Sequence, residues 1–262
     1  MSDPKFVHRY VPWAVVTGAS EGIGAAFARA VAARGVGVVL VARRADRLEL
    51  LASELRAAHG VEARTVSADL GTTAGVAQVL AATAPLDVGL LVTAAGFGSI
   101  GSFVELQASS EVEMVDVNVR SVVALSHPLA ARMAQRGRGG LVFLSSIVAF
   151  QGVPGSSTYA ATKAFVQSFA EGLAGELRPR GVDVIASAPG PVRSGFAGRA
   201  GMVMGATETP DVVAASTLAS LGGFVTVRPG GLAKLLGWSL ATAPRFLRVW
   251  LMTRIMAGMK PG

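Results

Sequence analysis

Tyr159 and Lys163 stand four residues apart in the stretch YAATK, a spacing that places both side chains on one face of a helix. A tyrosine normally ionises near pH ~10, and a nearby ammonium or oxidised nicotinamide ring would lower that pKa by stabilising the phenolate. Such a tyrosine can protonate the alkoxide that forms when a carbonyl is reduced. The spacing alone is common, so two ordinary helix residues remain the better interpretation until other groups join them.

Ser146 supplies a third group, because it ends the apolar stretch GLVFLSS (140–146) and precedes Tyr159 by 13 positions. Ligands bind at the carboxyl ends of strands in open parallel sheets. At that position the Ser146 hydroxyl could donate a hydrogen bond to a carbonyl oxygen. Lys163 would lower the tyrosine pKa and hold a ribose hydroxyl, and Ser156 or Ser157 is expected to cap the helix.

The elements that must position these groups alternate regularly along the chain. Strands are expected at 13–18, 36–43, 61–70, 87–96, 140–146, 182–190 and 224–228. Helices are expected at 24–35, 45–60, 72–84, 108–117, 119–136, 157–178 and 210–221, with Pro128 starting or kinking a turn. The alternation predicts one α/β domain over 1–230, a doubly wound Rossmann-type fold with about seven parallel strands and helices on both faces.

A glycine-rich turn, TGASEGIG (17–24), leaves the first expected strand and enters the first helix. Gly18, Gly22 and Gly24 permit a tight turn and a close approach of backbone to a ligand. The N-terminus of the following helix presents free N–H groups to phosphate. The turn therefore predicts a pyrophosphate site, although a glycine loop without a ligand is the alternative when the turn is considered alone.

The second expected strand ends in Arg43 and Arg44, where a site for NAD(H) usually has an acidic residue. A guanidinium binds phosphate through two parallel hydrogen bonds and stays charged. The pair therefore favours NADP(H) over NAD(H). Alternatively, one arginine is solvated or pairs with Asp46 or Glu49, and Glu21 inside the glycine turn opposes phosphate if it points that way.

Taken together, these motifs resemble the short-chain dehydrogenase/reductase family over roughly residues 12–228. The glycine turn, ADL (68–70), Asn118 in VDVNVRS, Ser146, YAATK and APGPVRS (188–194) occur in that family's order and spacing. The resemblance implies a catalytic group of Asn118, Ser146, Tyr159 and Lys163, in which Asn118 holds a water that links Lys163 to solvent. It implies a cofactor site made by Gly18, Ser20, Gly22, Ile23, Gly24, Arg43, Arg44, Asp69, Leu70, Ala95, Gly96, Tyr159, Lys163, Pro189, Gly190, Val192 and Ser194.

Within that site Asp69 and Leu70 would flank the adenine, and Val192 would meet the nicotinamide amide through its backbone. Ser194 would contact the same amide from the position where the family usually has threonine. Thr93 in TAAG (93–96) departs from the family's usual asparagine and offers one donor fewer. The ARR end and the RPGGLAKLL segment (228–236) look most like a bacterial, NADP-preferring subset of the family. Members usually form dimers or tetramers, here through the helices near 100–136 and 157–178.

The composition of the chain excludes or disfavours several other kinds of chemistry. The chain has 262 residues, 51% of them hydrophobic, and contains no cysteine, so thiol chemistry and disulfides are excluded. The three histidines follow no metal-ligand spacing, and no metal site is expected. The lack of cysteine suits a reducing cytoplasm, which is the expected location, and the N-terminal stretch MSDPKFVHRY lacks the apolar core of a signal peptide.

The stretch 196–210 is either a surface loop or a lid over the substrate. In the second case, several apolar side chains suggest a pocket for a lipophilic ketone or alcohol: Phe97, Ile147, Val148, Phe150, Val153, Phe196 and Met202.

The last segment, 231–262, is basic, apolar and expected to be helical over 232–257 with a break at Pro244. After Asp211 the chain has six basic residues and no acid. Its uncharged stretch 235–244 cannot span a bilayer of about 30 Å, and its arginines do not form one helical stripe. Packing on the substrate cleft is the first interpretation, followed by a subunit interface and peripheral membrane contact. Nucleic-acid binding is not expected, since aromatic and basic residues are not interleaved.

The sequence thus predicts an NADP(H)-dependent enzyme that transfers a hydride between nicotinamide and a carbonyl or alcohol, with Tyr159 as acid and base. Two other classes stay open. One is a dinucleotide-binding sensor or scaffold without catalysis, because fold does not fix function. The other is a membrane-peripheral reductase.

Overall fold

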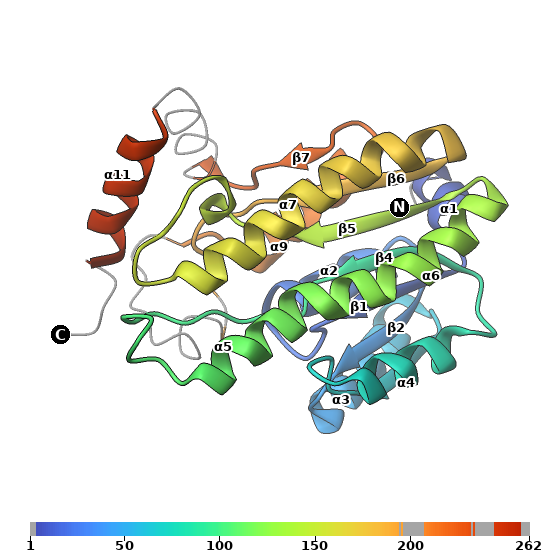
Figure 1. Cartoon of the computed structure of the whole chain (residues 1–262). Coiled ribbons are helices and arrows are strands. Elements are labelled where there is room, and N and C mark those ends of the chain that lie inside the picture. Colours follow the sequence, from blue (N-terminus) through green and yellow to red (C-terminus); the bar gives the residue numbers. More distant parts are fainter. Residues whose placement is uncertain (1–3, 194, 196–206, 232, 234–243, 258–262) are drawn as a thin grey trace.

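The computed structural model describes residues 4–193, 195, 207–231, 233 and 244–257, and it shows a sheet between two layers of helices (Figure 1). The strands are β1 (Trp13–Thr17), β2 (Gly37–Ala42), β3 (Ala63–Ser67), β4 (Val88–Thr93), β5 (Gly139–Leu144), β6 (Val182–Ser187) and β7 (Thr226–Val227). They pair in parallel in the order β3-β2-β1-β4-β5-β6-β7. This confirms the predicted seven-stranded, doubly wound sheet.

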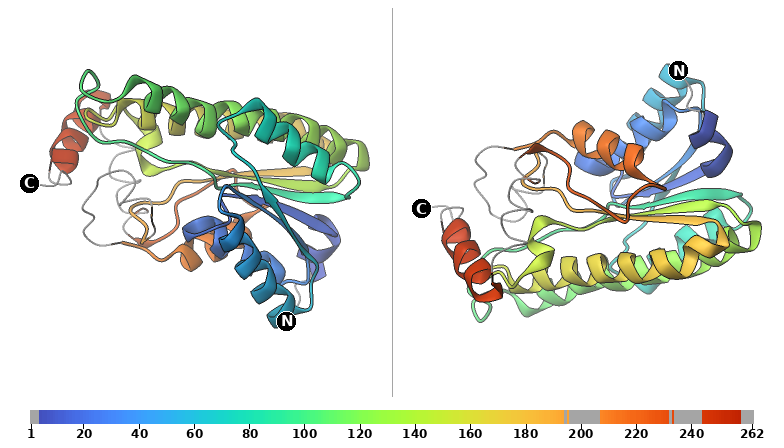
Figure 2. Two further views of the ribbon diagram at one scale, coloured as in Figure 1. Left: turned by 90° about the horizontal axis from the view of Figure 1, so that it is seen from below. Right: turned by 90° about the horizontal axis from the view of Figure 1, so that it is seen from above.

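Helices cover both faces of this sheet, as the two views of Figure 2 show. Side chains from α2 (Gly22–Ala32), α3 (Ala45–His59) and α9 (Pro210–Ser220) pack in the hydrophobic core on one face. Side chains from α4 (Thr73–Thr83), α6 (Ser121–Arg136) and α7 (Ser157–Leu177) pack in the core on the other face. Every residue of β1, β4, β5 and β6 is buried, which explains why these strands read as continuous apolar runs in the sequence.

A short helix that the sequence analysis did not predict, α1 (Pro4–Tyr10), closes the amino end of the sheet. The Tyr10 hydroxyl donates a hydrogen bond of 2.7 Å to the Asp183 carboxylate on β6, and the Arg9 guanidinium pairs with the same carboxylate. Asp183 is buried, so these two partners offset the cost of removing its charged carboxylate from water.

One continuous helical segment runs from α5 (Ala108–Val115) through a π-helical turn, η1 (Asp116–Arg120), into α6. The prediction of two separate helices at 108–117 and 119–136 was therefore wrong. Pro128 lies inside α6, which continues to Arg136. A π turn is a local bulge within an α-helix and often marks a functional site. Asn118 lies within this turn.

The remaining described elements are two 3₁₀ turns and the last helix. A 3₁₀ turn, η2 (Ile147–Phe150), follows β5, and a second one, η3 (Arg178–Arg180), follows α7. The last described helix, α11 (Arg245–Ala257), begins directly after Pro244 and lies at the left of Figure 1. Of the helical segment expected before Pro244, residues 232 and 234–243 lie outside the described residues. No helix in the described part of the chain is both long and apolar enough to cross a bilayer.

Candidate active site

The glycine turn between β1 and α2 is shaped by contacts that exclude side chains. Gly18 adopts φ +67°, and a Cβ added there would lie 2.8 Å from the backbone of Ala94 and Ala95. A Cβ on Gly24 would lie only 2.2 Å from the Gly18 carbonyl oxygen. Glu21, the residue before α2, makes no side-chain cap, so the first N–H groups of this helix have no side-chain acceptor from it. The turn is therefore a cradle of backbone atoms, and the first N–H groups of α2 are not capped by the Glu21 side chain.

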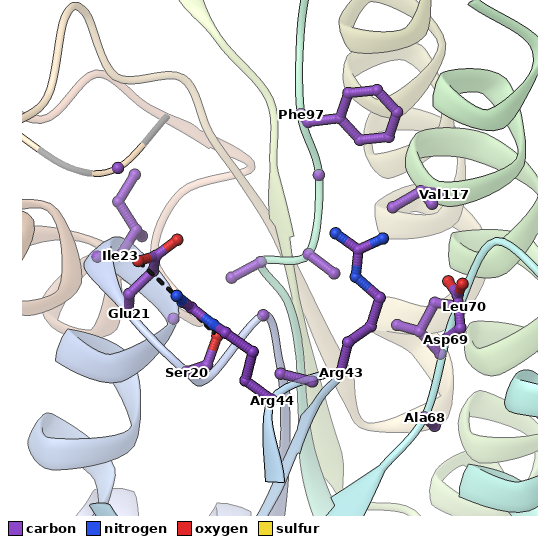
Figure 3. A pocket seen from close by; sticks show the side chains of 18 of the residues that line it. Ser20, Glu21, Ile23, Arg43, Arg44, Ala68, Asp69, Leu70, Phe97 and Val117 are labelled. Carbon is purple, nitrogen blue, oxygen red and sulfur yellow. Dashed lines mark hydrogen bonds and ion pairs between the residues drawn. The ribbon is translucent and has the colours of Figure 1, made fainter. Parts of the chain in front are cut away.

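A cavity of about 390 Å³ opens beside this cradle (Figure 3). It brings together eleven of the predicted cofactor residues: Gly18, Ser20, Gly22, Ile23, Gly24, Arg43, Arg44, Asp69, Leu70, Ala95 and Gly96. The sequence analysis did not single out the other lining residues apart from Glu21 and Phe97: Ala42, Ala68, Ala94, Glu113, Val117 and Gly195.

Arg43 and Arg44 reach into this cavity from the end of β2 (Figure 3). Arg44 lies 2.8 Å from the Glu21 carboxylate and donates a hydrogen bond to the Ser20 hydroxyl at 3.1 Å. Arg43 lies 3.6 Å from the carboxylate of Glu113 on α5. The alternative pairing with Asp46 or Glu49 is wrong, since both arginines pair with acids that line the cavity.

The adenine end of the expected site contains an ordered turn after β3. The Asp69 carboxylate accepts a hydrogen bond from the Gly71 N–H at 2.9 Å. Arg120, whose guanidinium also pairs with Asp116, donates to the Gly71 carbonyl at 2.7 Å. The π turn and the 69–71 turn therefore support each other.

Asn118 is almost fully buried, and its amide is bonded within the protein. The amide nitrogen donates to the Phe97 carbonyl at 2.9 Å and to the Thr162 hydroxyl at 3.1 Å, while the amide oxygen accepts from the Phe97 N–H at 3.2 Å. A Cβ on Gly96 would lie 2.9 Å from the same oxygen. Asn118 thus fixes the backbone after β4, and Thr162, which lies inside YAATK, is a partner to which the sequence analysis gave no role.

Ser146 and Tyr159 are hydrogen-bonded to each other. Ser146 lies at the end of β5, and its hydroxyl also accepts a long hydrogen bond, 3.4 Å, from the Val148 N–H. Burial raises the pKa of Tyr159 to about 12, and the hydrogen bond from Ser146 acts in the opposite direction. The sequence predicted a lowered pKa; in the protein alone desolvation of the phenolate dominates.

Lys163 lies one turn after Tyr159 on α7 and is buried. Its ammonium donates to the Leu144 carbonyl at 2.7 Å and lies 5.7 Å from the centre of the Tyr159 ring. Burial lowers the pKa of Lys163 to about 8. Ser145, which the sequence analysis did not single out, donates to the Lys163 carbonyl at 3.3 Å. Ser156 precedes α7 but does not cap it, because its hydroxyl donates to the Ser99 carbonyl instead.

The segment after β6 runs beside this group. The Pro189 carbonyl accepts a hydrogen bond from the Ile147 N–H at 3.1 Å, and Ile147 also lies near Gly190. Val192 is buried and forms a parallel bridge with Glu208. Ser194, Phe196, Met202 and the rest of the expected lid up to residue 206 lie outside the described residues.

Thr93, the departure from the usual asparagine, is buried at the end of β4. Its hydroxyl donates a long hydrogen bond, 3.4 Å, to the Val142 carbonyl on β5. Thr17 on β1 supports the same loop, because its hydroxyl accepts from the Ala95 N–H at 3.1 Å. The loop 93–96 is therefore held from both neighbouring strands.

Two apolar clusters lie near the residues that the sequence predicts to be catalytic. Phe97 packs with Met114 and Val117, against which Tyr159 is partly buried. Val153, Ala160 and Met252 form a second cluster, against which Ile100 and Val148 pack. Through Met252, α11 contacts the segment between Ser146 and Tyr159.

The family model described as short chain dehydrogenase matches residues 12–201. The chain is 35% identical over 176 residues to a 7beta-hydroxysteroid dehydrogenase of Collinsella aerofaciens, covering 67% of each chain. It is 31% identical to a very-long-chain 3-oxoacyl-CoA reductase of Danio rerio, covering 65% of this chain and 56% of that one.

Solved structures extend the likeness over nearly the whole chain. One, from work on 7beta-hydroxysteroid dehydrogenase stereoselectivity, gives a TM-score of 0.86 at 28% identity and covers 94% of this chain and 98% of its own. Another is a short-chain dehydrogenase from Sphingobium yanoikuyae in complex with NADPH, with a TM-score of 0.80 at 32% identity, covering 90% and 97%.

The chain belongs to the short-chain dehydrogenase family. It is an oxidoreductase that transfers a hydride between a nicotinamide cofactor and a substrate with a C=O or CH–OH group.

Proposed function

We propose that this protein is an NADP(H)-dependent reductase or dehydrogenase of lipophilic ketones and alcohols, in which Tyr159 is the acid and base. The observation that carries the proposal is the hydrogen-bonded Ser146–Tyr159 pair, with Lys163 one turn away on the same helix. A bound nicotinamide cofactor supplies or accepts the hydride.

The protein's own residues handle the proton. With a pKa of about 12, Tyr159 is protonated at neutral pH, so it can donate a proton to the alkoxide oxygen that forms during reduction. Ser146 donates a hydrogen bond to the same oxygen and stabilises its developing charge. Lys163, with a pKa of about 8, is mostly charged at pH 7 and favours the phenolate that Tyr159 leaves behind. Asn118 positions the backbone at Gly96 and Phe97 beside them, and the water-mediated link to solvent is part of this proposal.

The cradle fits a dinucleotide. Gly18 and Gly24 leave no room for side chains, and the start of α2 offers uncapped N–H groups to a pyrophosphate. Ser20, Gly22 and Ile23 would complete this cradle, and Asp69 and Leu70 would flank the adenine. Lys163 has two N–H groups beyond its bond to Leu144 and would hold a ribose hydroxyl, while Ala95, Gly96, Pro189, Gly190, Val192 and Ser194 would border the nicotinamide half.

Preference for NADP(H) is supported by Arg43 and Arg44 and by the lack of an acid at the end of β2. The competing ion pairs are weak because their side chains are about half exposed, as the 46% and 57% of Arg44 and Glu21 illustrate. A 2′-phosphate offers a doubly charged, bidentate acceptor that can replace a single carboxylate.

A lipophilic substrate is supported by the two apolar clusters that contain Phe97 and Val153. We propose that residues 1–230 form the catalytic domain and that 231–262 form an extension that covers the substrate cleft. The burial of Met252 against Val153 and Ala160 supports this placement.

Assembly and location are part of the same proposal: a cytoplasmic homodimer or homotetramer. Exposed apolar residues on the outer helices support association: Val112, Val115, Val123 and Phe165. No role in nucleic-acid binding or metal chemistry is proposed.

Peripheral membrane contact is a second candidate role, favoured by the outer face of α11. Phe246 and Trp250 are 75% and 53% exposed, and the helix also carries Arg245, Arg248 and Arg254. Sedimentation with anionic but not with neutral vesicles, lost in the Phe246→Ser/Trp250→Ser variant, is the expected result. Equal sedimentation with both kinds of vesicle, or none, would reject this role.

The central experiment measures turnover of a panel of carbonyls and alcohols with NADPH and NADH by absorbance. We expect turnover with NADPH preferred, and loss of at least about 10³-fold in Tyr159→Phe with cofactor binding intact. Tyr10→Phe is the matched control, because it removes the chain's other phenol hydroxyl at the far end of the sheet. Cofactor binding without turnover of any compound would instead support a sensor, and preference for NADH would overturn the role of the arginines.

A further inference from the structure

Arg228 lies directly after β7, at the edge of the sheet from which Ser146 also emerges. Its guanidinium carbon lies 4.7 Å from the centre of the Phe150 ring. Phe150 ends the turn η2, which begins after Ser146. A cation over an aromatic face is attracted to it, so the Phe150 ring helps to hold the Arg228 guanidinium at this position.

The Arg228 side chain has no acid partner within the described part of the chain. Its Nε is buried and has no hydrogen-bond partner there, and no described carboxylate lies within 4.0 Å of it. Arg136 is the instructive contrast, since its Nε is also buried without a hydrogen bond but lies 2.9 Å from the Asp87 carboxylate. A buried donor on a cation is costly to leave unpaired, which points to a partner group outside the described part of the chain, such as a bound ligand.

A second open polar atom lies beside the stacked ring. Gln151, the neighbour of Phe150, is 4% exposed. Its amide nitrogen donates to the Ile147 carbonyl at 3.1 Å, whereas its amide oxygen has no hydrogen-bond partner among the residues that the structure describes. Within the described residues, the Nε of Arg228, which lies against Phe150, and the amide oxygen of Gln151, which follows Phe150, are thus both without a hydrogen-bond partner.

The position of β7 shows which ligand these groups can reach. β7 lies four strands from β1, or roughly 19 Å at about 4.8 Å per strand, so Arg228 is remote from the glycine cradle and from any phosphate held there. It lies only two strands from β5, or roughly 10 Å, which is within the length of one small molecule whose carbonyl meets Ser146.

We propose that Arg228, oriented by Phe150 and assisted by Gln151, binds a carboxylate of the substrate about 10 Å from the reacting carbonyl. This inference rests on the proposed function, and it narrows the substrate class to lipophilic keto acids and hydroxy acids. Arg228 determines specificity and takes no part in the proton transfer. The Gln151 oxygen would accept a hydrogen bond from a hydroxyl or from a water beside the carboxylate.

The test uses a panel of lipophilic keto acids, each paired with its methyl ester, and compares wild type with Arg228→Gln. For wild type we expect KM for an acid to lie roughly 10- to 100-fold below KM for its ester. Arg228→Gln should abolish that difference by raising KM for the acid, with kcat and KM for the ester unchanged. Arg228→Lys should recover only part of it, because lysine keeps the charge and loses the planar, stacked fork.

Arg180→Gln is the matched control, since it removes one positive charge from an exposed position on η3. It should keep the preference for the acid, and thermal unfolding of each variant checks that the fold is intact. An equal KM for acid and ester in wild type, or an unchanged preference in Arg228→Gln, would overturn the inference.

A binding measurement separates this inference from the proposed function. Thermal shifts with a saturated lipophilic carboxylate, which has no carbonyl to reduce, should appear in wild type and disappear in Arg228→Gln. If neither acids nor esters are turned over, the proposed function fails, while this shift still decides whether Arg228 binds a carboxylate.

Discussion

The two halves of the carboxyl edge of the sheet are built in different ways. Around β1 and β4 the wall is backbone, and a Cβ added at Gly18 or Gly24 would meet other main-chain atoms at 2.8 or 2.2 Å. Around β5 and β7, where we propose that the substrate binds, the contacts are made by side chains from distant segments, such as Val153, Met252 and Arg228. A surface made of backbone atoms fits one ligand shape. A surface made of side chains can change by substitution while the fold stays the same. Substitutions in the proposed substrate region can therefore change substrate recognition without changing recognition of the cofactor.

Gly24→Ala is expected to have the largest effect. It tests the region around β1 and β4, where we propose that the cofactor binds. Its new methyl group would meet the rigid Gly18 carbonyl, so we expect the free energy of unfolding to fall by roughly 3 kcal/mol and cofactor binding to be lost. Chemical denaturation and fluorescence titration with NADPH measure these effects. Gly172→Ala is the control, since a Cβ there meets nothing within 4 Å and should stabilise α7 by about 0.5–1 kcal/mol. A Gly24→Ala protein that binds cofactor normally would contradict the backbone wall.

Lys163→Met tests a residue that is proposed to contact both the cofactor ribose and Tyr159. Turnover should fall by about 10²-fold or more. The cofactor-free protein should become more stable, because charging a buried lysine whose pKa has fallen from 10.5 to about 8 costs up to roughly 3 kcal/mol. Lower stability of the variant at pH 7 would show that the bond to Leu144 outweighs this cost.

The pH dependence of that stability difference follows from linkage. Between about pH 8 and pH 10.5 the unfolded chain holds the Lys163 proton while the folded protein has lost it. Stability of the wild type should therefore rise with pH across this window relative to Lys163→Met. The advantage of the variant should be full below pH 8 and vanish near pH 10.5, as measured by urea unfolding at several pH values.

The double substitution Arg43→Gln/Arg44→Gln should weaken the affinity for NADPH and leave the affinity for NADH nearly unchanged. We expect KM for NADPH to rise about 10- to 100-fold because two charged donors to the 2′-phosphate are lost. KM for NADH should stay within about 2-fold, since NADH has no phosphate there. Steady-state kinetics with both cofactors measures the ratio, and a parallel loss with NADH would mean that the arginines support the fold instead.

Met252→Ala should have the smallest effect and should be confined to the substrate half. Loss of this buried side chain weakens the contact of α11 with Val153 and Ala160, so KM for lipophilic ketones should rise by about 3- to 10-fold. Binding of NADPH should not change. Trp250→Ala, on the exposed face of the same helix, is the control and should leave both values unchanged in the absence of vesicles. A changed affinity for NADPH in Met252→Ala would contradict the proposal that the cofactor and the substrate bind to separate regions.

The same division explains how much the sequence could predict. The cofactor turn is local: Gly18, Gly22 and Gly24 are close in the chain, and backbone geometry alone dictates their type. Parallel strands with both faces covered are continuous apolar runs, so the sheet was also predictable. Tyr159 and Lys163 were predictable because one helical turn connects them.

What the sequence could not predict depends on contacts between distant segments. Glu113 pairs with Arg43 across 70 positions, and nothing near either residue marks that contact. The pKa of Tyr159 depends on burial, which spacing does not report. Arg228 is one of six basic residues after Asp211, and only the stacked Phe150 and the open Nε distinguish it from a solvated arginine.

The π turn that holds Asn118 amounts to one additional residue absorbed within a helix. Met114 before the bulge and Leu125 after it are both buried. Deletion of a single residue from 116–120 would therefore restore a regular helix with its buried faces still in phase. Such a shortened chain should fold and yet lose the hold on Gly96 and Phe97, so the core and the active site make separate demands on the length of this helix.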